Sequence, residues 1–447
     1  MRPVKDLRLN AIEHQPHELP ISASTSLDSI YRTISWRLLP LLMLLYGIAY
    51  IDRINVSFAK LQMGSEVGIT NTVFGVGAGI FFSGYLMFQV PSNYIVTRVG
   101  VRRWVSYISI GWGLVSCGMA FVSGPASFYR LRFLLGIAEA AYFPAVILYL
   151  TAWYPERYRG RVMATFLSSF QIAAMVGGPL AGLLMERFSG VAGLKGWQWL
   201  FLLEGLAPII LGIAAYFMMV ERPANAPWLT AGEKDSIQRE TSFALHATDK
   251  KFAAAFKNIR TYVFGLGYFT IIFASYVLTF WMPTLIRSVG VVRISTIGYF
   301  SAIPSAVAII SMWLVGKISD KRGGRVAYTL VGALLGAVGL FAIPLVLGKL
   351  WLTLAVLCSA NAGLCFAVST FWAIPGSYRS GPEAAAGIAI INTLGALGGF
   401  VGPALMGWIT DASGAVNSGL YMTVVLLLIG VGLLLAGSSA GQYERQV

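Results

Sequence analysis

Long apolar segments alternate with short polar ones along nearly the whole chain. Each apolar segment has about 20 residues, enough for a helix to cross a bilayer core of about 30 Å. Twelve of them lie at residues 37–59, 73–96, 102–122, 126–150, 160–185, 197–220, 261–283, 295–316, 326–347, 350–373, 384–409 and 418–437. Ten-residue strands of alternating polarity, which are typical of membrane β-barrels, do not occur. The pattern predicts an all-α polytopic membrane protein with twelve transmembrane helices.

The polar segments divide these helices into two groups of six. The N-terminal residues lack the apolar core of a cleaved signal peptide, so we expect the first helix to direct insertion. The polar stretch in the middle of the chain is predicted to be a linker on the membrane surface, where Thr230 and Glu233 have the spacing of a helix capping box. The predicted division is a tail at 1–36, a bundle at 37–220, the linker at 221–260, a bundle at 261–438 and a tail at 439–447.

The two groups of helices repeat each other. The loop after the eighth helix, "GKISDKRGGR", matches "TRVGVR" after the second helix at an offset of 223 residues. At the ends of the fifth and eleventh helices, "GPLAGLLMERFSG" matches "GPALMGWITDASG" at an offset of 224 residues. A parallel repeat of six plus six helices predicts two bundles related by an axis along the membrane normal, with a binding site between them at mid-depth.

The formal net charge is +14, and the placement of the positive residues along the chain indicates the membrane topology. If both termini are cytoplasmic, the cytoplasmic segments hold 24 of the 33 Lys and Arg residues, and the opposite loops hold seven. This asymmetry follows the positive-inside rule, so it indicates both termini in the cytoplasm and contact with anionic lipid. We therefore expect the lipid bilayer as a partner and no nucleic acid.

Enzyme and cofactor signatures are weak. The phosphate-binding pattern G-x-x-x-x-G-K-[ST] does not occur, and "GSSAG" at 437–441 matches a serine-hydrolase pattern only by coincidence, at the end of an apolar helix. All three histidines fall in polar segments, and Cys117, Cys358 and Cys365 lie inside predicted helices without metal-ligand spacing. We predict no enzymatic activity, no metal and no cofactor, with the proton as coupling ion.

Charged residues deep inside the predicted helices are the strongest functional signal. A charged side chain at a helix centre costs about 2.5 to 3.5 kcal/mol on insertion scales, so such residues are paired or functional. All of them fall in the first group of helices: Asp52, Arg53, Arg132, Glu139 and Glu204. The second group has only uncharged polar residues at depth: Asn361, Ser369, Thr370 and Asn392.

Depth along the helices suggests how these charges are arranged. At 1.5 Å per residue, Asp52 lies about 10 Å and Arg132 about 9 Å below the outer surface, so the two are level and we expect them to pair. Glu139 follows Arg132 by two turns on the same helix face. Arg53 is turned about 100° from Asp52 and must face another partner.

This arrangement leads to a hypothesis for proton and anion binding. Arg53 would bind a substrate carboxylate, for which its planar fork suits bidentate hydrogen bonds. Asp52 would pair with Arg132, and Asp52 and Glu139 would carry protons. The alternative is a buried salt-bridge network that only holds two helices together, although four charges are an expensive way to do so. For Glu204 we expect a packing or helix-pairing role.

Several motifs resemble a known family. The loop "GxxxD(R/K)xGxR" and the 6+6 repeat resemble the major facilitator superfamily. Within it, "YIDRIN", "VPSN", "LRFLLGIAEA", "WYPERYRGR" and "GWQWLFLLEG" resemble the anion:cation symporter family and its bacterial tartrate, phthalate and 4-hydroxyphenylacetate permeases. One departure is Thr97, where the superfamily pattern has Asp, so the expected gating contact is weaker there.

The resemblance implies further roles. It implies a monomer in the cytoplasmic (inner) membrane of a bacterium, a gating loop with Asp320, Lys321 and Arg325, and a cavity completed by Tyr85, Gln171 and Asn392. It also implies rocker-type alternating access and the same roles for the deep charges. We expect import of a small organic acid anion by proton symport, with one carboxylate favoured over two because the second bundle offers no deep cation. The alternatives are a solute-binding membrane sensor without transport, or an exporter or antiporter of the same superfamily.

Overall fold

The computed structural model describes residues 21–241, 258–322, 325–372, 374 and 382–443, and every regular element in these ranges is a helix. In the first half these are α1 (Ile21–Ile54), α2 (Val56–Glu66), α3 (Asn71–Val99), α4 (Val101–Gly118), η1 (Met119–Phe121), α5 (Pro125–Glu139), α6 (Tyr142–Trp153), α7 (Glu156–Arg187), η2 (Val191–Gly193) and α8 (Gly196–Met218). The linker contributes η3 (Pro223–Asn225) and α9 (Ala231–Thr241). The second half contributes α10 (Ile259–Ser288), α11 (Ile294–Arg322), α12 (Arg325–Val346), α13 (Leu350–Phe371), α15 (Pro382–Ser413) and α16 (Val416–Tyr443).

The described residues contain twelve helical spans that are long and apolar enough to cross a membrane, as the sequence predicts. Two of these spans are interrupted. The first consists of α1 and α2, which meet at Asn55, and the fourth consists of α5 and α6, which meet at Ala140 and Ala141. The structure also starts α1 at Ile21, well before the first apolar segment. The early start is stabilised by Tyr31, whose ring packs on the rings of Tyr154 and Tyr158.

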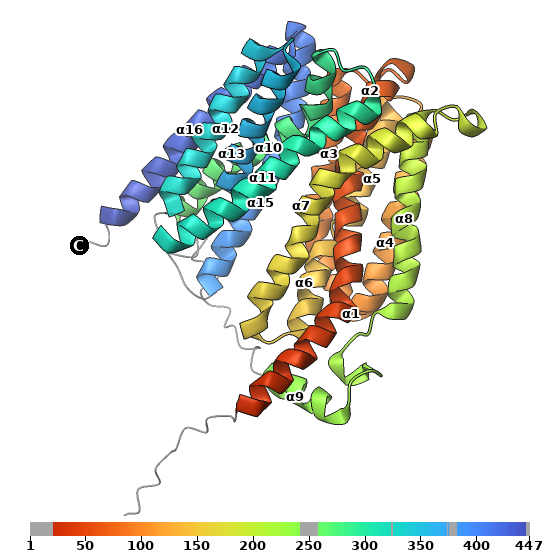
Figure 1. Ribbon diagram of the computed structural model, residues 1–447, viewed down its shortest axis with the longest axis vertical. Helices are drawn as coiled ribbons and strands as arrows, with labels where there is room; N and C mark the ends of the chain where they lie inside the picture. Colours follow the sequence, from red (N-terminus) through yellow and green to blue (C-terminus); the bar gives the residue numbers. More distant parts are fainter. Residues whose placement is uncertain (1–20, 242–257, 323–324, 373, 375–381, 444–447) are drawn as a thin grey trace, which may run out of the picture.

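The twelve spans form two bundles, α1–α8 and α10–α16, with α9 at one end of the first (Figure 1). We call the end of the molecule where α9 lies the linker side and the opposite end the far side. The linker packs on the first bundle: Trp228 stacks on Trp153 with ring centroids 5.7 Å apart, and Arg157 forms an ion pair with Glu240 at 2.8 Å.

The capping box predicted in the linker is present. The backbone N–H of Thr230 donates to Glu233 Oε2 at 2.8 Å, and the backbone N–H of Glu233 donates to Thr230 Oγ1 at 3.3 Å. These two bonds satisfy backbone donors that the first turn of α9 leaves free.

On the far side, two carboxylates join the bundles at equivalent places of the repeat. Asp411 of α15 accepts hydrogen bonds from Asn71 Nδ2 at 2.8 Å and from the backbone N–H of Thr72 at 2.7 Å, at the start of α3. Glu186 of α7 accepts from Arg293 Nη2 at 2.8 Å and from the backbone N–H of Ser295 at 3.3 Å, at the start of α11. Each carboxylate therefore caps the positive end of a helix in the other bundle. We call these two contacts the far-side latches.

Close backbone approach accompanies both latches. A Cβ added at Gly75 of α3 would collide with the carbonyl oxygen of Pro403, and one added at Gly298 of α11 would collide with that of Gly178. Gly75 and Gly298 are separated by the repeat offset of 223 residues. The bundles thus meet tightly on the far side, whereas their lower ends in Figure 1, toward the linker side, lie apart.

Candidate functional site

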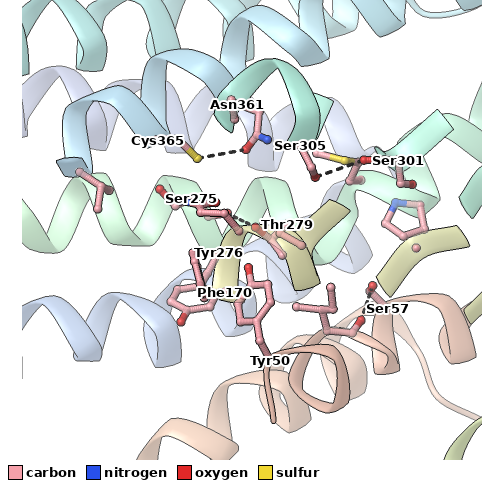
Figure 2. A pocket seen from close by; sticks show the side chains of 18 of the residues that line it. Tyr50, Ser57, Phe170, Ser275, Tyr276, Thr279, Ser301, Ser305, Asn361 and Cys365 are labelled. Carbon is pink, nitrogen blue, oxygen red and sulfur yellow. Dashed lines mark hydrogen bonds between the residues drawn. The ribbon is translucent and has the colours of Figure 1, made fainter. Parts of the chain in front are cut away.

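A cavity of about 160 Å³ lies between the two bundles. Its lining comes from both, with side chains from α1, α2 and α7 of the first bundle and from α10, α11 and α13 of the second. Figure 2 shows Tyr50 and Ser57 on one wall, facing Asn361 and Ser305 across the cavity. The polar lining residues are Tyr50, Ser57, Gln171, Ser275, Tyr276, Thr279, Ser301, Ser305 and Asn361, none of which is charged.

Several cavity hydroxyls come in pairs four residues apart on one helix. Ser275 Oγ donates to the Ile271 carbonyl at 2.8 Å and Thr279 Oγ1 to the Ser275 carbonyl at 2.8 Å, both within α10. Ser301 and Ser305 of α11 make equivalent bonds to carbonyls one turn earlier. Because their hydrogens point into their own helices, these hydroxyls present oxygen lone pairs to the cavity, and a rotation of the hydroxyl would offer a donor instead.

Beside this cavity, a buried ion pair links α1 to α5. Arg53 Nη2 donates to Glu139 Oε2 at 3.0 Å, with exposed side-chain fractions of 16% for Arg53 and 0% for Glu139. The Arg53 guanidinium also lies over the rings of Phe81 and Tyr85 of α3, with its Cζ 4.9 and 5.4 Å from their centroids. Neither member of the pair lines the cavity, but Tyr50 and Ile54, which flank Arg53 on α1, do.

Helix α1 therefore presents three different faces around Arg53. Tyr50 and Ile54 line the cavity, Arg53 points to α3 and α5, and Asp52 points to α4. With about 100° between successive residues, consecutive positions of one helix must face different neighbours. The charged residues of "YIDRIN" are thus distributed around the helix, and neither Asp52 nor Arg53 lines the cavity.

Asp52 belongs to a second buried polar cluster, on the side of α1 that faces α4 and α8. Asn55 Nδ2 donates to Asp52 Oδ1 at 3.1 Å and to Glu204 Oε2 at 2.8 Å, and Ser116 Oγ donates to Asp52 Oδ1. Asp52 and Glu204 are 1% and 5% exposed. Asn55 lies where α1 gives way to α2, so the helix interruption coincides with the residue that joins the two carboxyls.

The expected ion pair between Asp52 and Arg132 is not formed among the described residues. Arg132 is fully buried, donates from Nε to the Gly77 carbonyl at 3.2 Å and lies over the Phe81 ring at 5.0 Å. Within the part of the chain that the structure describes, its two terminal nitrogens have no hydrogen-bond partner. Counting residues along each helix places Asp52 and Arg132 at the same depth. It does not determine the direction in which each side chain leaves its helix.

The other predicted cavity residues have different outcomes. Gln171 of α7 lines the cavity and donates to Met312 Sδ at 2.9 Å. Tyr85 lies against Arg53 and outside the lining, and Asn392 is exposed on α15 and also outside it. The sequence analysis missed the hydroxyl pairs of α10 and α11, although their four-residue spacing places each pair on one helix face and could have revealed them.

The gating loop is described only in part. Asp320 and Lys321 belong to α11, but their side chains lie outside the described part of the structure, and Arg325 is exposed at the start of α12. In the first bundle, Thr97 Oγ1 donates to the Tyr94 carbonyl at 2.8 Å. Glu221 accepts from the first two backbone N–H groups of α4, so a carboxylate from beyond α8 caps that helix.

Comparisons with known proteins agree with this architecture. The sequence-family model that describes the Major Facilitator Superfamily matches residues 42–403. A protein of Agrobacterium vitis that carries the provisional name of a tartrate transporter is 42% identical over 93% of this chain and 93% of its own. The quinolone resistance transporter of Acinetobacter baumannii is 38% identical over 93% of this chain and 96% of its own. A bacterial homologue of the human lysosomal transporter Spinster, solved in an inward-facing and occupied conformation, has a TM-score of 0.76 at 16% identity, covering 92% of this chain and 97% of that one.

Proposed function

Because the chain belongs to the major facilitator superfamily of membrane transporters, we propose that it imports a small organic acid anion by proton symport. The observation that carries the proposal is the ion pair of Arg53 with Glu139 beside a neutral, hydroxyl-lined cavity. A guanidinium binds carboxylates bidentately, and here its partner is a buried carboxylate that can be neutralised by a proton.

Coupling follows from competition for Arg53. When Glu139 takes a proton, its carboxylate no longer balances the Arg53 charge, and a substrate carboxylate can take its place. The guanidinium stays paired throughout, while one proton and one negative charge have entered the site together. Substrate and proton thus stabilise the same loaded state, which is the thermodynamic requirement for symport. Asp52 provides the second proton-carrying carboxyl of the proposal.

The direction of opening follows from the contacts between the bundles. The positive-inside rule makes the linker side cytoplasmic, so the closed far side faces the outside of a bacterial cytoplasmic membrane. The far-side latches and the Gly75 and Gly298 contacts would have to separate before the cavity could open outward. We propose that the chain alternates between this arrangement and an outward-open one, by rigid-body rocking of the two bundles as a monomer.

The cavity favours a hydroxylated monocarboxylate or a small hydroxy diacid. Arg53 supplies one carboxylate site, and the hydroxyls of Ser275, Thr279 and Ser305 can donate to or accept from substrate hydroxyls. No residue that lines the cavity is a cation, so the second carboxylate of a hydroxy diacid would bind to neutral hydroxyl and amide groups. The relative named for tartrate transport is consistent with this class.

The test is uptake of labelled acids into proteoliposomes with an imposed inward proton gradient. The panel includes tartrate, phthalate, 4-hydroxyphenylacetate and sugar acids, and wild type is compared with Glu139→Gln. We expect the gradient to drive uptake in wild type, and Glu139→Gln to remove the response to the gradient while exchange between equal pools continues. Uptake that ignores both the gradient and Glu139 would contradict the proposal, and binding without any uptake would favour a sensor.

Export is the second candidate function, favoured by the 38% identical quinolone resistance transporter. An exporter driven by protons would accumulate quinolone in everted vesicles only when the lumen is acidic. If quinolone moves under these conditions and the acids do not, antiport replaces symport as the function.

A further inference from the structure

Glu204 is a deeply buried carboxyl that the mechanism above does not use. It follows the start of α8 by eight residues, about 12 Å from the far side at 1.5 Å per residue. Its Oε2 accepts from Asn55 Nδ2 at 2.8 Å, whereas its Oε1 is buried and finds no partner among the described residues. A packing or helix-pairing role, as expected from the sequence, would require no ionisable group at this position.

Among the residues that the structure describes, Glu204 has a like charge nearby and no counter-charge. The same Asn55 nitrogen that binds Glu204 also binds Asp52, so the two carboxyls are one amide group apart. Neither carboxyl takes part in an ion pair among the described residues. Arg132 of α5 and Arg53 interact electrostatically with the Asp52 carboxylate without forming an ion pair with it. The charged group that interacts electrostatically with Glu204 is Asp52. Ser116 and Cys117 complete the α4 side as neutral groups.

Two ionised carboxylates in this position would carry a high energetic cost. Burial removes the water that stabilises each charge, and repulsion between the two adds to the penalty. Carboxyl pairs in such sites commonly hold one proton between them, because one charge is then removed. We propose that Asp52 and Glu204 share one proton across Asn55 and that Glu204 is a third carboxyl of the proton-coupling machinery.

Asn55 gives this pair a way to respond to the proton. Its Oδ1 is buried and has no partner in the described ranges, and a carboxylic acid needs an acceptor for its hydrogen. Rotation of the Asn55 carboxamide brings Oδ1 to whichever carboxyl holds the proton. When Glu204 releases its proton and Asp52 binds one, Glu204 becomes the carboxylate and Asp52 the acid, so the pair keeps a total charge of −1. Glu204, nearer the far side, is then the carboxyl that a proton from outside meets first.

The experiment compares Glu204→Gln with wild type and with the control Glu66→Gln. Gln keeps the shape of Glu and can accept the Asn55 hydrogen bond, so a purely structural role would survive the change. Glu66 lies at the end of α2 on the far side, bonded to Trp197 Nε1 at 2.9 Å, and is outside the proposed machinery. The first readout is the infrared carboxylic acid band of the purified protein in lipid. The second is the stimulation of uptake by an imposed proton gradient.

We expect Glu204→Gln to lose carboxylic acid absorbance that wild type and Glu66→Gln retain, and Asp52→Asn to lose the same band. We expect gradient stimulation to fall about tenfold in Glu204→Gln, within the usual range of coupling between two sites. An unchanged spectrum overturns the shared proton, and a lost band with full gradient stimulation overturns the role in coupling.

The coupling part rests on the proposed symport, and the two can fail separately. If the gradient does not drive uptake in wild type, symport is wrong, yet the infrared band still decides whether the carboxyls share a proton. Should Glu204→Gln fail to fold, Asp52→Asn provides the same spectral test.

Discussion

The two bundles share a backbone plan and differ in their chemistry. At the repeat offset of 223, Asp52 and Arg53 of α1 correspond to Ser275 and Tyr276 of α10. The far-side contacts repeat as well: Gly75 is matched by Gly298 and Thr72 by Ser295 at the same offset, and their partners in the other bundle lie within two residues of it. Backbone geometry has therefore been kept where the bundles must meet, whereas the interior side chains have diverged. In our proposal the first bundle handles charge and protons, and the second shapes the cavity for the substrate.

The largest expected effect breaks the charged side of this comparison. Arg53→Gln leaves Glu139 as a buried charge without its partner, a loss of about 3 to 5 kcal/mol for a buried pair. We expect this variant to lose both uptake and exchange and to give little folded protein by size-exclusion chromatography. Adding Glu139→Gln removes the orphaned charge, so the double variant should recover folded yield but not transport. Normal transport by Arg53→Gln would contradict a role for Arg53 in binding the anion.

The next prediction tests the feature that the bundles have in common. Gly75→Leu and Gly298→Leu each place a side chain against a backbone carbonyl of the other bundle, so both should weaken far-side closure. We expect labelling of cysteines introduced into the far-side part of the cavity to rise severalfold in both variants, in keeping with closure contacts worth a few kcal/mol. Gly111→Leu is the matched control, because a Cβ at Gly111 meets no atom within 4 Å. A response in only one of the two variants would show that the repeat does not extend to closure.

A smaller effect is expected from the hydroxyls of the second bundle. Thr279→Val keeps the volume and shape of the side chain and removes one hydrogen-bonding group, worth about 0.5 to 1.5 kcal/mol. We expect KM to rise about three- to tenfold for a hydroxylated acid. An analogue without hydroxyls should be unaffected, and the response to the proton gradient should be retained. Loss of the gradient response in Thr279→Val would contradict the proposal that proton coupling belongs to the first bundle and substrate binding to the second.

The smallest effect is expected at the far-side latches. Glu186→Gln and Asp411→Asn each weaken one interaction with a helix end, worth about 0.3 to 1 kcal/mol. In each single variant, labelling of cysteines introduced on the far side should rise by a factor between just under two and about five. In the double variant it should rise more than in either single variant. If one latch variant has no effect at low salt, the two latches are not equivalent.

The fold could be predicted from the sequence because hydropathy reports directly which segments can cross a bilayer. Depth of the charges was also accessible, since it depends only on residue counts along each helix. The direction of each side chain was not. Arg53 bonds to Glu139 and Asp52 to Asn55 and Ser116, and neither partnership follows from depth. The interruption at Asn55 was hidden as well, because no glycine or proline stands beside Asn55 and the predicted segment 37–59 continues past it.

The far-side latches also bear on how this protein can evolve. In each latch one donor is a backbone N–H, of Thr72 or of Ser295, which nearly every amino acid supplies. Only proline lacks it. Substitutions can therefore accumulate at positions 72 and 295 without losing this bond, while the acceptors Asp411 and Glu186 are constrained. We expect lineages of this protein to vary freely at the donor positions, to avoid proline there, and to retain an acidic residue at the acceptor positions.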